Sequence, residues 1–425
     1  MSTATAAPPA PPAIATATAA PALPPPGGGR LLSVDALRGF DMFWILGGDE
    51  LVQAFYRVCG SPRNGLLATL HEQFEHCDWQ GFHLEDLIFP LFVFIAGISL
   101  VFSLTKAIER DGRAVAISRI IRRGLLLVAC GIVYYGGISK GWDDVRLLGV
   151  LQRIGLAYMC AGLLFCFLKP RGLLIACISI LLGYWALMAW VPIRDIQLND
   201  DTIHQLREQT GISDPHALYA RTTATVSGHY EPGYNLSDHI DFQYLPGRKW
   251  DKYHDPEGML STLGAVATCL LGVLAGVLLR NRTLSDQRRL AIMVASGVAM
   301  VGLGQLWGLE FPVVKKIWSS SFVLVAGGWS MLLLATFHWL IDVRGWKGWT
   351  LPFVWIGMNA ITVYLIENMV PLGSIAGRFL GGPLKHWLNA GVATGLGDLV
   401  LIAGQFGLIL LIAWYLHRKQ IFMRL

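Results

Sequence analysis

The sequence predicts an all-α, polytopic membrane helix bundle with about ten transmembrane helices. Of its 425 residues, 54% are hydrophobic and only 15% are charged, and the mean hydropathy is +0.49. In soluble globular proteins about a quarter of the residues are charged. The apolar residues also come in blocks of about twenty, the length that crosses a hydrocarbon core of about 30 Å. We expect helices because a spanning segment must satisfy its own backbone hydrogen bonds.

The expected spans follow one another along most of the chain. They are residues 34–56, 84–105, 117–138, 147–168, 171–191, 259–280, 288–307, 319–341, 351–371 and 397–416. Residues 1–29 are rich in alanine and proline and carry no charge, so we expect a disordered cytoplasmic tail there. Residues 30–425 are then expected to form a single membrane domain.

Lysine and arginine are divided unevenly between the short loops. One set of loops collects most of them, including those at 106–123, 169–171, 280–289 and 418–424. The positive-inside rule places this set and both termini in the cytoplasm. Loops 57–83 and 192–258 then lie on the far side, which we expect to be the periplasm of a bacterial inner membrane. Because the basic residues lie at the ends of apolar blocks rather than on one patch, the expected surroundings are lipid, with no nucleic-acid partner.

The stretch "HEQFEHCDWQGFHLED" (71–86) gathers histidines, carboxylates and a thiol directly before an apolar span. It resembles the zinc motif H-E-x-x-H but has one residue too many. At about 100° per helical residue, His71 and His76 lie about 140° apart on a helix and cannot chelate one ion. We therefore expect no metal site. Cys59 and Cys77 flank this loop, and either a disulfide or two free thiols is compatible with the sequence.

Catalysis is the alternative, because a neutral imidazole at the mouth of a membrane protein is a natural general base. Asp49 and Glu50 lie near the end of the first span, close to the same membrane face, and Glu85 and Asp86 open the second. Acidic groups on two adjoining helix ends around a histidine loop indicate an assembled polar site, since ionisable residues at membrane depth are expensive. Each histidine, taken singly, is equally compatible with a solvated loop.

Several longer motifs carry a resemblance to a known family. "RLLSVDALRGFDMFWILGG" and "FEHCDWQGFHLEDLIFPLFVFIAG" resemble the heparan-α-glucosaminide N-acetyltransferase family and its bacterial transmembrane acyltransferase relatives. The resemblance extends through 149–159, 250–276, 312–324 and 352–368, and it is weak in 192–249. It thus covers nearly everything after residue 30, in order.

The resemblance implies an enzyme that moves an acetyl group from cytoplasmic acetyl-CoA, its donor substrate, to an amino sugar or glycan on the other side of the membrane. The family's catalytic histidine in "H-x-x-W-x-G" matches His76, followed by Trp79 and Gly81. Asp49 corresponds to an asparagine of the family, and an aspartate cannot donate an amide hydrogen bond to a thioester oxygen. We expect Asp49 or Asp86 to orient the imidazole, and direct transfer with His76 as general base rather than through an acetyl-histidine.

Other polar residues at the span ends are expected to bind the substrates. Candidates for the acceptor are Gln152, Arg153, Asp255, Glu257, Lys316, Trp318, Ser319, Asn359 and Glu367. Arg153 could instead pair with a buried acid. Candidates for the phosphates of CoA are Arg38, Arg119, Arg122 and Arg123, for which topology anchoring is the competing explanation.

Two other functional classes fit the same composition. A sugar or amino-sugar permease also has buried charges in a bundle of this size, and a membrane scaffold would use none of these residues chemically. Homologous-looking bundles often dimerise, so a homodimer is the candidate assembly.

Overall fold

The computed structural model describes residues 31–139 and 141–422, so the expected tail at 1–29 lies outside the described residues. The predicted all-α fold is confirmed. Between the helices there are only two short strands, the antiparallel pair β1 (Ile193–Arg194) and β2 (Thr225–Val226), within the described residues. The longer α-helices are α4 (Leu84–Asp111), α5 (Arg113–Tyr134), α6 (Val150–Phe167), α7 (Pro170–Trp190), α11 (Thr262–Arg280), α12 (Asp286–Trp307), α13 (Ser320–Phe337) and α18 (Leu396–Arg418).

Shorter helices complete the chain. They are α1 (Leu32–Phe43), α2 (Asp49–Val58), α3 (Leu66–Gln73), α8 (Asp200–Thr210), α9 (Pro215–Arg221), α10 (Leu236–Tyr244), α14 (Leu351–Met358), α15 (Ala360–Met369), α16 (Leu372–Leu380) and α17 (Gly382–Gly391). Short π-helical segments lie at Trp44–Gly48 and His338–Val343, and short 3₁₀ helices lie at Trp142–Asp144 and Gly348–Thr350.

Seven of the described helices are long and apolar enough to cross a membrane, where the sequence predicts ten spans. An eighth span is obtained if Gly348–Met358 and Ala360–Met369 are counted together, although a 68° bend separates them. The remaining expected spans, 34–56 and 117–138, are helical but do not belong to this set. The first is broken at Gly47, whose φ of +102° favours glycine. The second carries three arginines in its amino-terminal half.

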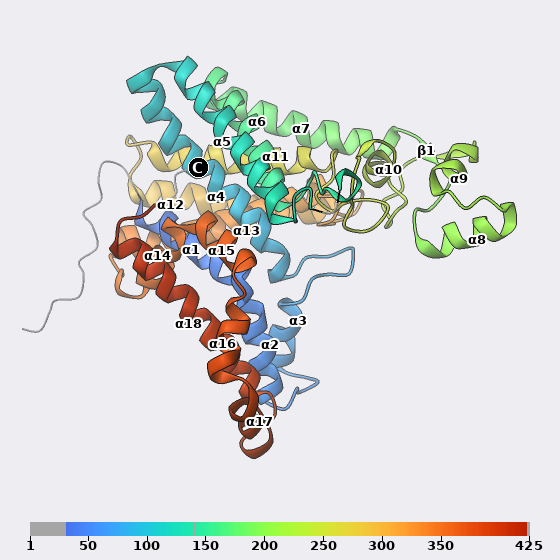
Figure 1. Ribbon diagram of the computed structural model, residues 1–425. Helices are drawn as coiled ribbons and strands as arrows, with labels where there is room; N and C mark the ends of the chain where they lie inside the picture. The colour runs from blue at the N-terminus through green and yellow to red at the C-terminus, as the bar shows by residue number, and fades with distance from the viewer. Residues whose placement is uncertain (1–30, 140, 423–425) are drawn as a thin grey trace, which may run out of the picture.

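Helix α11 lies at the centre of the bundle and packs against α4, α6, α7 and α13 (Figure 1). Helix α1 packs along α14, and this contact depends on two glycines. A Cβ atom on Gly39 would lie 1.7 Å from the carbonyl oxygen of Phe353, and one on Gly357 would lie 2.1 Å from that of Asp35. The close approach fixes the end of α14, where the chain bends, against the start of α1.

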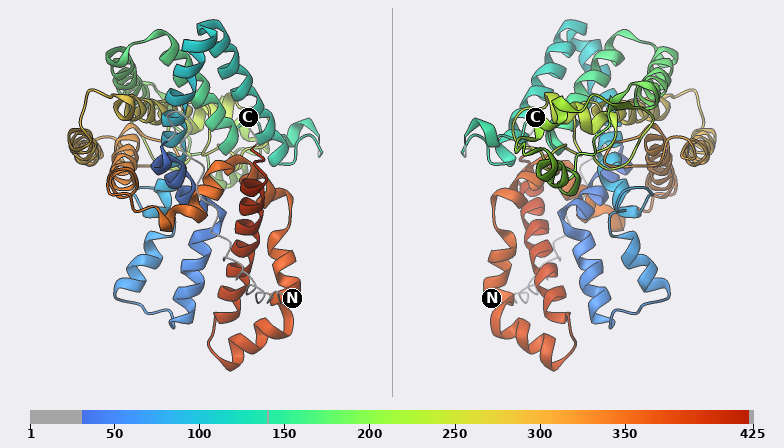
Figure 2. Two further views of the ribbon diagram at one scale, coloured as in Figure 1. Left: turned by 90° about the vertical axis from the view of Figure 1, so that its left-hand side faces the viewer. Right: turned by 90° about the vertical axis from the view of Figure 1, so that its right-hand side faces the viewer.

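Helices α2 and α3 lie beside α16, α17 and α18, to one side of the main bundle (Figure 2). The loop that follows α3 returns to the bundle and leads into α4. Cys59 and Cys77, at the two ends of this region, are both free thiols.

The loop at 192–258 forms a small outer domain beyond the end of α7, with α8, α9, α10 and the β1–β2 pair (Figure 1). It has a hydrophobic cluster of its own that includes Ile203, Leu218 and Phe242. Asn199, Asp214 and Asn235 cap its three helices by accepting hydrogen bonds from backbone N–H groups in the first turn. Sequence alone did not predict this ordered, helical structure.

Candidate active site

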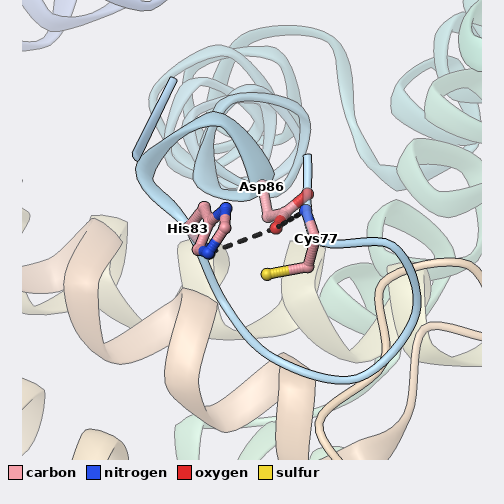
Figure 3. Close-up of side chains that lie close together, drawn as sticks. All are labelled: Cys77, His83 and Asp86. Carbon is pink, nitrogen blue, oxygen red and sulfur yellow. Dashed lines mark hydrogen bonds between the residues drawn. The ribbon is translucent and has the colours of Figure 1, made fainter. Parts of the chain in front are cut away.

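The carboxylate of Asp86 is fixed at the start of α4. One of its oxygens, Oδ2, accepts hydrogen bonds from the backbone N–H groups of Cys77 (3.3 Å) and His83 (3.1 Å) (Figure 3). The side chain is only 1% exposed. An ionised carboxylate is favoured at this position because the amino-terminal end of a helix carries positive partial charge. The other oxygen, Oδ1, is left to face His76.

The imidazole of His76 lies against this second oxygen. Its Nδ1 is 3.1 Å from Asp86 Oδ1, and its side chain is 60% exposed. Of the two acids expected to orient the imidazole, the structure therefore brings Asp86 into contact with it. Asp49 begins α2 and interacts electrostatically with Glu85 instead.

Lys315 is a third member of this cluster and was missed by sequence reasoning, which selected its neighbour Lys316. Its Nζ lies 3.1 Å from His76 Nδ1 and 3.2 Å from Asp86 Oδ1. The segment around Lys315 is held beside the histidine loop by a hydrogen bond from Gly81 N to Val313 O. A usable signal was the lysine pair in "VVKKIW", because lysines are scarce in the short loops on the predicted far side.

The two contacts of His76 Nδ1 exclude each other as hydrogen bonds. An ammonium group only donates and an ionised carboxylate only accepts. If Nδ1 carries the proton, it donates to Asp86 and Nε2 remains a base. If Lys315 donates to Nδ1, the proton is on Nε2 and the ring can only donate from that side. The ion pair between Lys315 and Asp86 is compatible with both tautomers, so this cluster controls which nitrogen can accept a proton.

An outer cavity of about 360 Å³ opens beside the cluster. Its wall combines His76, Asp86 and Lys315 with aromatic and polar side chains. Among the predicted site residues, it brings together the following: His76, Asp86, Glu257, Lys316 and Trp318. Trp79 and Trp250 add two further indole rings. The cavity is therefore mostly apolar, with a few charged groups at one end.

A second cavity of about 500 Å³, called the inner cavity, adjoins the outer one. Phe92, Ile154 and Ile361 line both cavities and form an apolar junction between them. The inner wall carries three cationic side chains, Arg38, Lys106 and Arg123, and one acidic side chain, Asp35, which pairs with Arg38 (3.2 Å).

The four arginines expected to bind phosphate are thus divided. Arg38 and Arg123 line the inner cavity, and Arg119 lines a neighbouring surface hollow that shares Ser103 and Lys106 with it. Arg122 is exposed and lines none of these cavities, which suits an anchor of the helix at the membrane surface.

Asp255 and Glu257 are held by Arg146, a second residue that sequence reasoning missed. The guanidinium donates to both oxygens of Asp255 (3.0 and 2.7 Å) and to Glu257 (2.6 Å). It also lies between the rings of Tyr135 (4.4 Å) and Trp250 (4.8 Å). Burial acts to lower the pKa of Arg146, but the two carboxylates raise it above its usual range. Arg146 thereby positions Glu257 and Trp250, which line the outer cavity.

Gln152 and Arg153 are fully buried behind the outer cavity. Gln152 donates to the carbonyl oxygen of Arg146. Arg153 donates to Ser261, and its guanidinium lies 4.9 Å from the ring of Trp318. Neither side chain lines a cavity, so both support residues that do.

The last predicted residues differ in their surroundings. Lys316 pairs with Asp251 (3.0 Å) at the rim of the outer cavity. Ser319 caps α13 and donates to Pro312 O (2.7 Å), away from either cavity. Glu367 lines neither cavity and interacts electrostatically with Glu50. Asn359 lines the inner cavity.

Cys77, His83 and Asp86 also place three possible metal ligands within 4.8 Å of one another (Figure 3). A zinc site would need the thiolate form of the cysteine. Burial, and next the Asp86 carboxylate, raise the pKa of the metal-free Cys77 thiol to about 11, so a metal ion would have to displace its proton. Both oxygens of Asp86 are already engaged. These three residues therefore fit a hydrogen-bonded loop better than a metal centre.

Comparison with known proteins finds similarity to one family of enzymes. Residues 30–198 match the family described as "Heparan-alpha-glucosaminide N-acetyltransferase, catalytic". The chain is similar to the heparan-α-glucosaminide N-acetyltransferase family. The mouse enzyme of that name is 27% identical over 391 residues, which cover 83% of this chain and 56% of the mouse protein. The human enzyme is 28% identical over 435 residues, covering 93% and 60%.

The predicted family resemblance is thus confirmed, and the chain spans somewhat more than half the length of the curated relatives it matches. The segment matched to the N-acetyltransferase family contains His76, Asp86 and Arg146. Lys315 and Asn359 lie beyond that segment.

Proposed function

We propose that this chain is a membrane acetyltransferase. It takes the acetyl group of acetyl-CoA on the cytoplasmic side and transfers it to the amine of an amino sugar or glycan on the far side. The observation that carries the proposal is the pair of cavities that meet at one apolar junction, with cations at the inner end and the His76 cluster at the outer end. The relation to N-acetyltransferases supports the reaction class.

The inner cavity suits the donor. Arg38, Lys106 and Arg123 supply positive charge for the phosphates of CoA. The junction of Phe92, Ile154 and Ile361 offers no charged group, so it suits the neutral pantetheine arm and not the nucleotide. The thioester at the end of that arm would then reach the outer cavity.

The outer cavity suits an amino sugar. Trp79, Trp250 and Trp318 provide flat apolar surfaces for sugar rings, and Glu257 and Lys316 provide hydrogen bonds at the edge. Arg146 holds Glu257 in place through a buried ion pair. A cavity with aromatic walls and few polar groups fixes the orientation of a small ligand.

In the reaction, the amine nitrogen attacks the carbonyl carbon of the thioester. The new C–N bond forms and the C–S bond breaks, so that acetyl-CoA and the amine yield an N-acetyl sugar and free CoA. His76 Nε2 takes the proton from the amine and returns it to the CoA sulfur. Asp86 holds the proton on Nδ1 during this cycle. Lys315 is the cation that can stabilise negative charge on the carbonyl oxygen.

Proteoliposomes with labelled acetyl-CoA on one side and glucosamine on the other test the proposal. We expect labelled N-acetylglucosamine, and we expect His76→Ala to lower kcat by about 10²–10⁴-fold while leaving CoA binding intact. The matched control is His71→Ala, because the His71 ring packs at a tilt against the ring of Tyr56 (centroids 4.0 Å apart) and His71 lines neither cavity.

A permease gives the opposite result. It would carry labelled glucosamine across unmodified, without acetyl-CoA, and His76→Ala would leave part of that transport. If a panel of amino sugars and hydroxyl acceptors yields no acetylated product, the acetyltransferase proposal is wrong.

A further inference from the structure

Asn359 lies at the bend between α14 and α15. Its backbone N–H donates to Ile356 O (3.0 Å), and its carbonyl oxygen accepts from Val363 N (2.9 Å). The backbone of the bend is therefore satisfied by the two helices. The side chain plays no part in this, so the bend itself does not explain why an asparagine is present.

The side-chain amide of Asn359 is buried and has no partner. The residue is only 3% exposed, and neither Nδ2 nor Oδ1 has a hydrogen-bond partner among the described residues. Leaving a buried donor and a buried acceptor unpaired is unfavourable, because both lose their hydrogen bonds to water. Such a group in a folded protein calls for a ligand or another explanation.

The cavity beside it supplies the place for a ligand. Asn359 lines the inner cavity together with Gly357, Met358 and Ala360. Two residues further on, Ile361 forms part of the apolar junction. Asn359 thus presents one donor and one acceptor just on the inner side of the passage between the cavities.

The surrounding structure holds the backbone next to Asn359 in a fixed place. Gly357 packs so closely on α1 that a methyl group there would lie 2.1 Å from Asp35 O. Arg38 donates to Gly357 O (3.2 Å) and also lines the inner cavity. A preorganised group loses little entropy when it binds a ligand.

The geometry points to a secondary amide as the partner of Asn359, namely one of the two amides of the pantetheine arm of CoA. In a trans amide the N–H and C=O point in opposite directions, so the carboxamide can pair with only one of these groups on a given amide, accepting from the N–H or donating to the C=O, and its other group can pair with the second amide of the arm. This inference rests on the proposed function and assigns Asn359 to the donor rather than to the acceptor sugar.

The test is a binding experiment on the full-length protein in nanodiscs with two probes. Coenzyme A carries the pantetheine arm, and adenosine 3′,5′-bisphosphate shares the nucleotide but lacks the arm. We expect Asn359→Leu to weaken coenzyme A binding by about tenfold, the loss of two hydrogen bonds, and to leave bisphosphate binding unchanged. Asn359→Gln, which keeps both groups, should bind coenzyme A more tightly than Asn359→Leu.

Thr362→Val is the matched control, because Thr362 Oγ1 is also buried without a partner but lines neither cavity. It should bind both probes as the wild type does. The ligand-free Asn359→Leu protein should unfold at or above the wild-type temperature, because the substitution removes two unsatisfied groups. A clear fall would show that Asn359 has protein partners and would overturn the inference.

Other outcomes are equally decisive. Unchanged coenzyme A binding by Asn359→Leu, equal weakening of both probes, or an effect only on KM for the amino sugar would each overturn this inference while leaving the acetyltransferase proposal intact. If the wild type binds neither probe and forms no product, the proposed function itself is wrong.

Discussion

Asp86→Asn is the sharpest test of the His76 cluster, because the two oxygens of Asp86 have separate tasks. Oδ2 accepts from the backbone N–H groups of Cys77 and His83, whereas Oδ1 faces His76 Nδ1 and the Lys315 ammonium. An asparagine must place its NH2 group on one of these two sides. On the Oδ2 side it would meet two N–H donors. The amide oxygen therefore takes the Oδ2 position, and the NH2 group faces His76.

This orientation reverses the tautomer of the imidazole. The NH2 group can only donate, so Nδ1 of His76 becomes the acceptor and its proton moves to Nε2. A ring protonated at Nε2 cannot take a proton from the attacking amine. Lys315 also loses the carboxylate that lies 3.2 Å from its Nζ. The fold is retained, because both backbone hydrogen bonds to the Oδ2 position survive.

The expected loss follows from the role of the base. General-base catalysis contributes about 10²–10⁴-fold, so we expect kcat of Asp86→Asn to fall by about 10³-fold, which corresponds to about 4 kcal/mol in the activation free energy. KM for acetyl-CoA should change little, because the inner cavity is not altered.

The assay is the initial rate of N-acetylglucosamine formation at saturating acetyl-CoA in proteoliposomes. Glu310→Gln serves as the control, since Glu310 is an exposed acid in the same segment as Lys315 and lines neither cavity. If Asp86→Asn keeps more than a tenth of the wild-type kcat, Asp86 does not set the tautomer and the reasoning is refuted.

Two further predictions concern the outer side of the protein. Arg146→Met leaves the buried Asp255 without its partner and should lower the free energy of unfolding by about 3–5 kcal/mol, measured by thermal unfolding in detergent. Arg248→Met, which removes a half-exposed cation 3.9 Å from Asp144, should change it by less than about 1 kcal/mol; equal effects would contradict the role of Arg146. Burial lowers the pKa of His239 to about 4, below about 6.5 in the unfolded chain. Between these values the unfolded state binds more protons, so the wild type should lose up to about 3 kcal/mol relative to His239→Gln as the pH falls from 6.5 to 4. Proteolysis of the outer domain measures this difference in stability. Burial also raises the pKa of Asp241 to about 7, but Asp241 titrates in both proteins, so its contribution cancels in the comparison. Parallel pH profiles would contradict it.

Sequence reasoning predicted the parts of the site that depend on local signals. Asp86 follows the start of an apolar span, and a carboxylate in the first turn of a helix is a local preference that can be read directly. The fold class followed from composition and block length in the same way. His76 was selected through the motif around it, which belongs to the segment that matches the family.

The residues that were missed depend on contacts between distant segments. Lys315 meets His76 across 239 residues, and Arg146 meets Asp255 across 109. No periodicity or local motif encodes such pairs. The expectation that Asn359 and Glu367 share one face assumed a straight helix, but the 68° bend begins at Asn359. The helices on both sides of the bend are apolar, so hydropathy gave no sign of the break.

The arrangement of the two cavities gives the proposed reaction a direction. The phosphates of CoA are multiply charged, and moving even one charge into an apolar region is very unfavourable unless it is paired. The cations of the described cavity walls lie on both sides of the junction: Arg38, Lys106 and Arg123 line the inner cavity, where Arg38 also pairs with Asp35 (3.2 Å), and Lys315 and Lys316 line the outer cavity and pair with Asp86 and Asp251. Moving a nucleotide from the inner end past Phe92, Ile154 and Ile361 is therefore electrostatically unfavourable. Its neutral arm can pass, so the acetyl group would reach His76 while the rest of the donor stays behind.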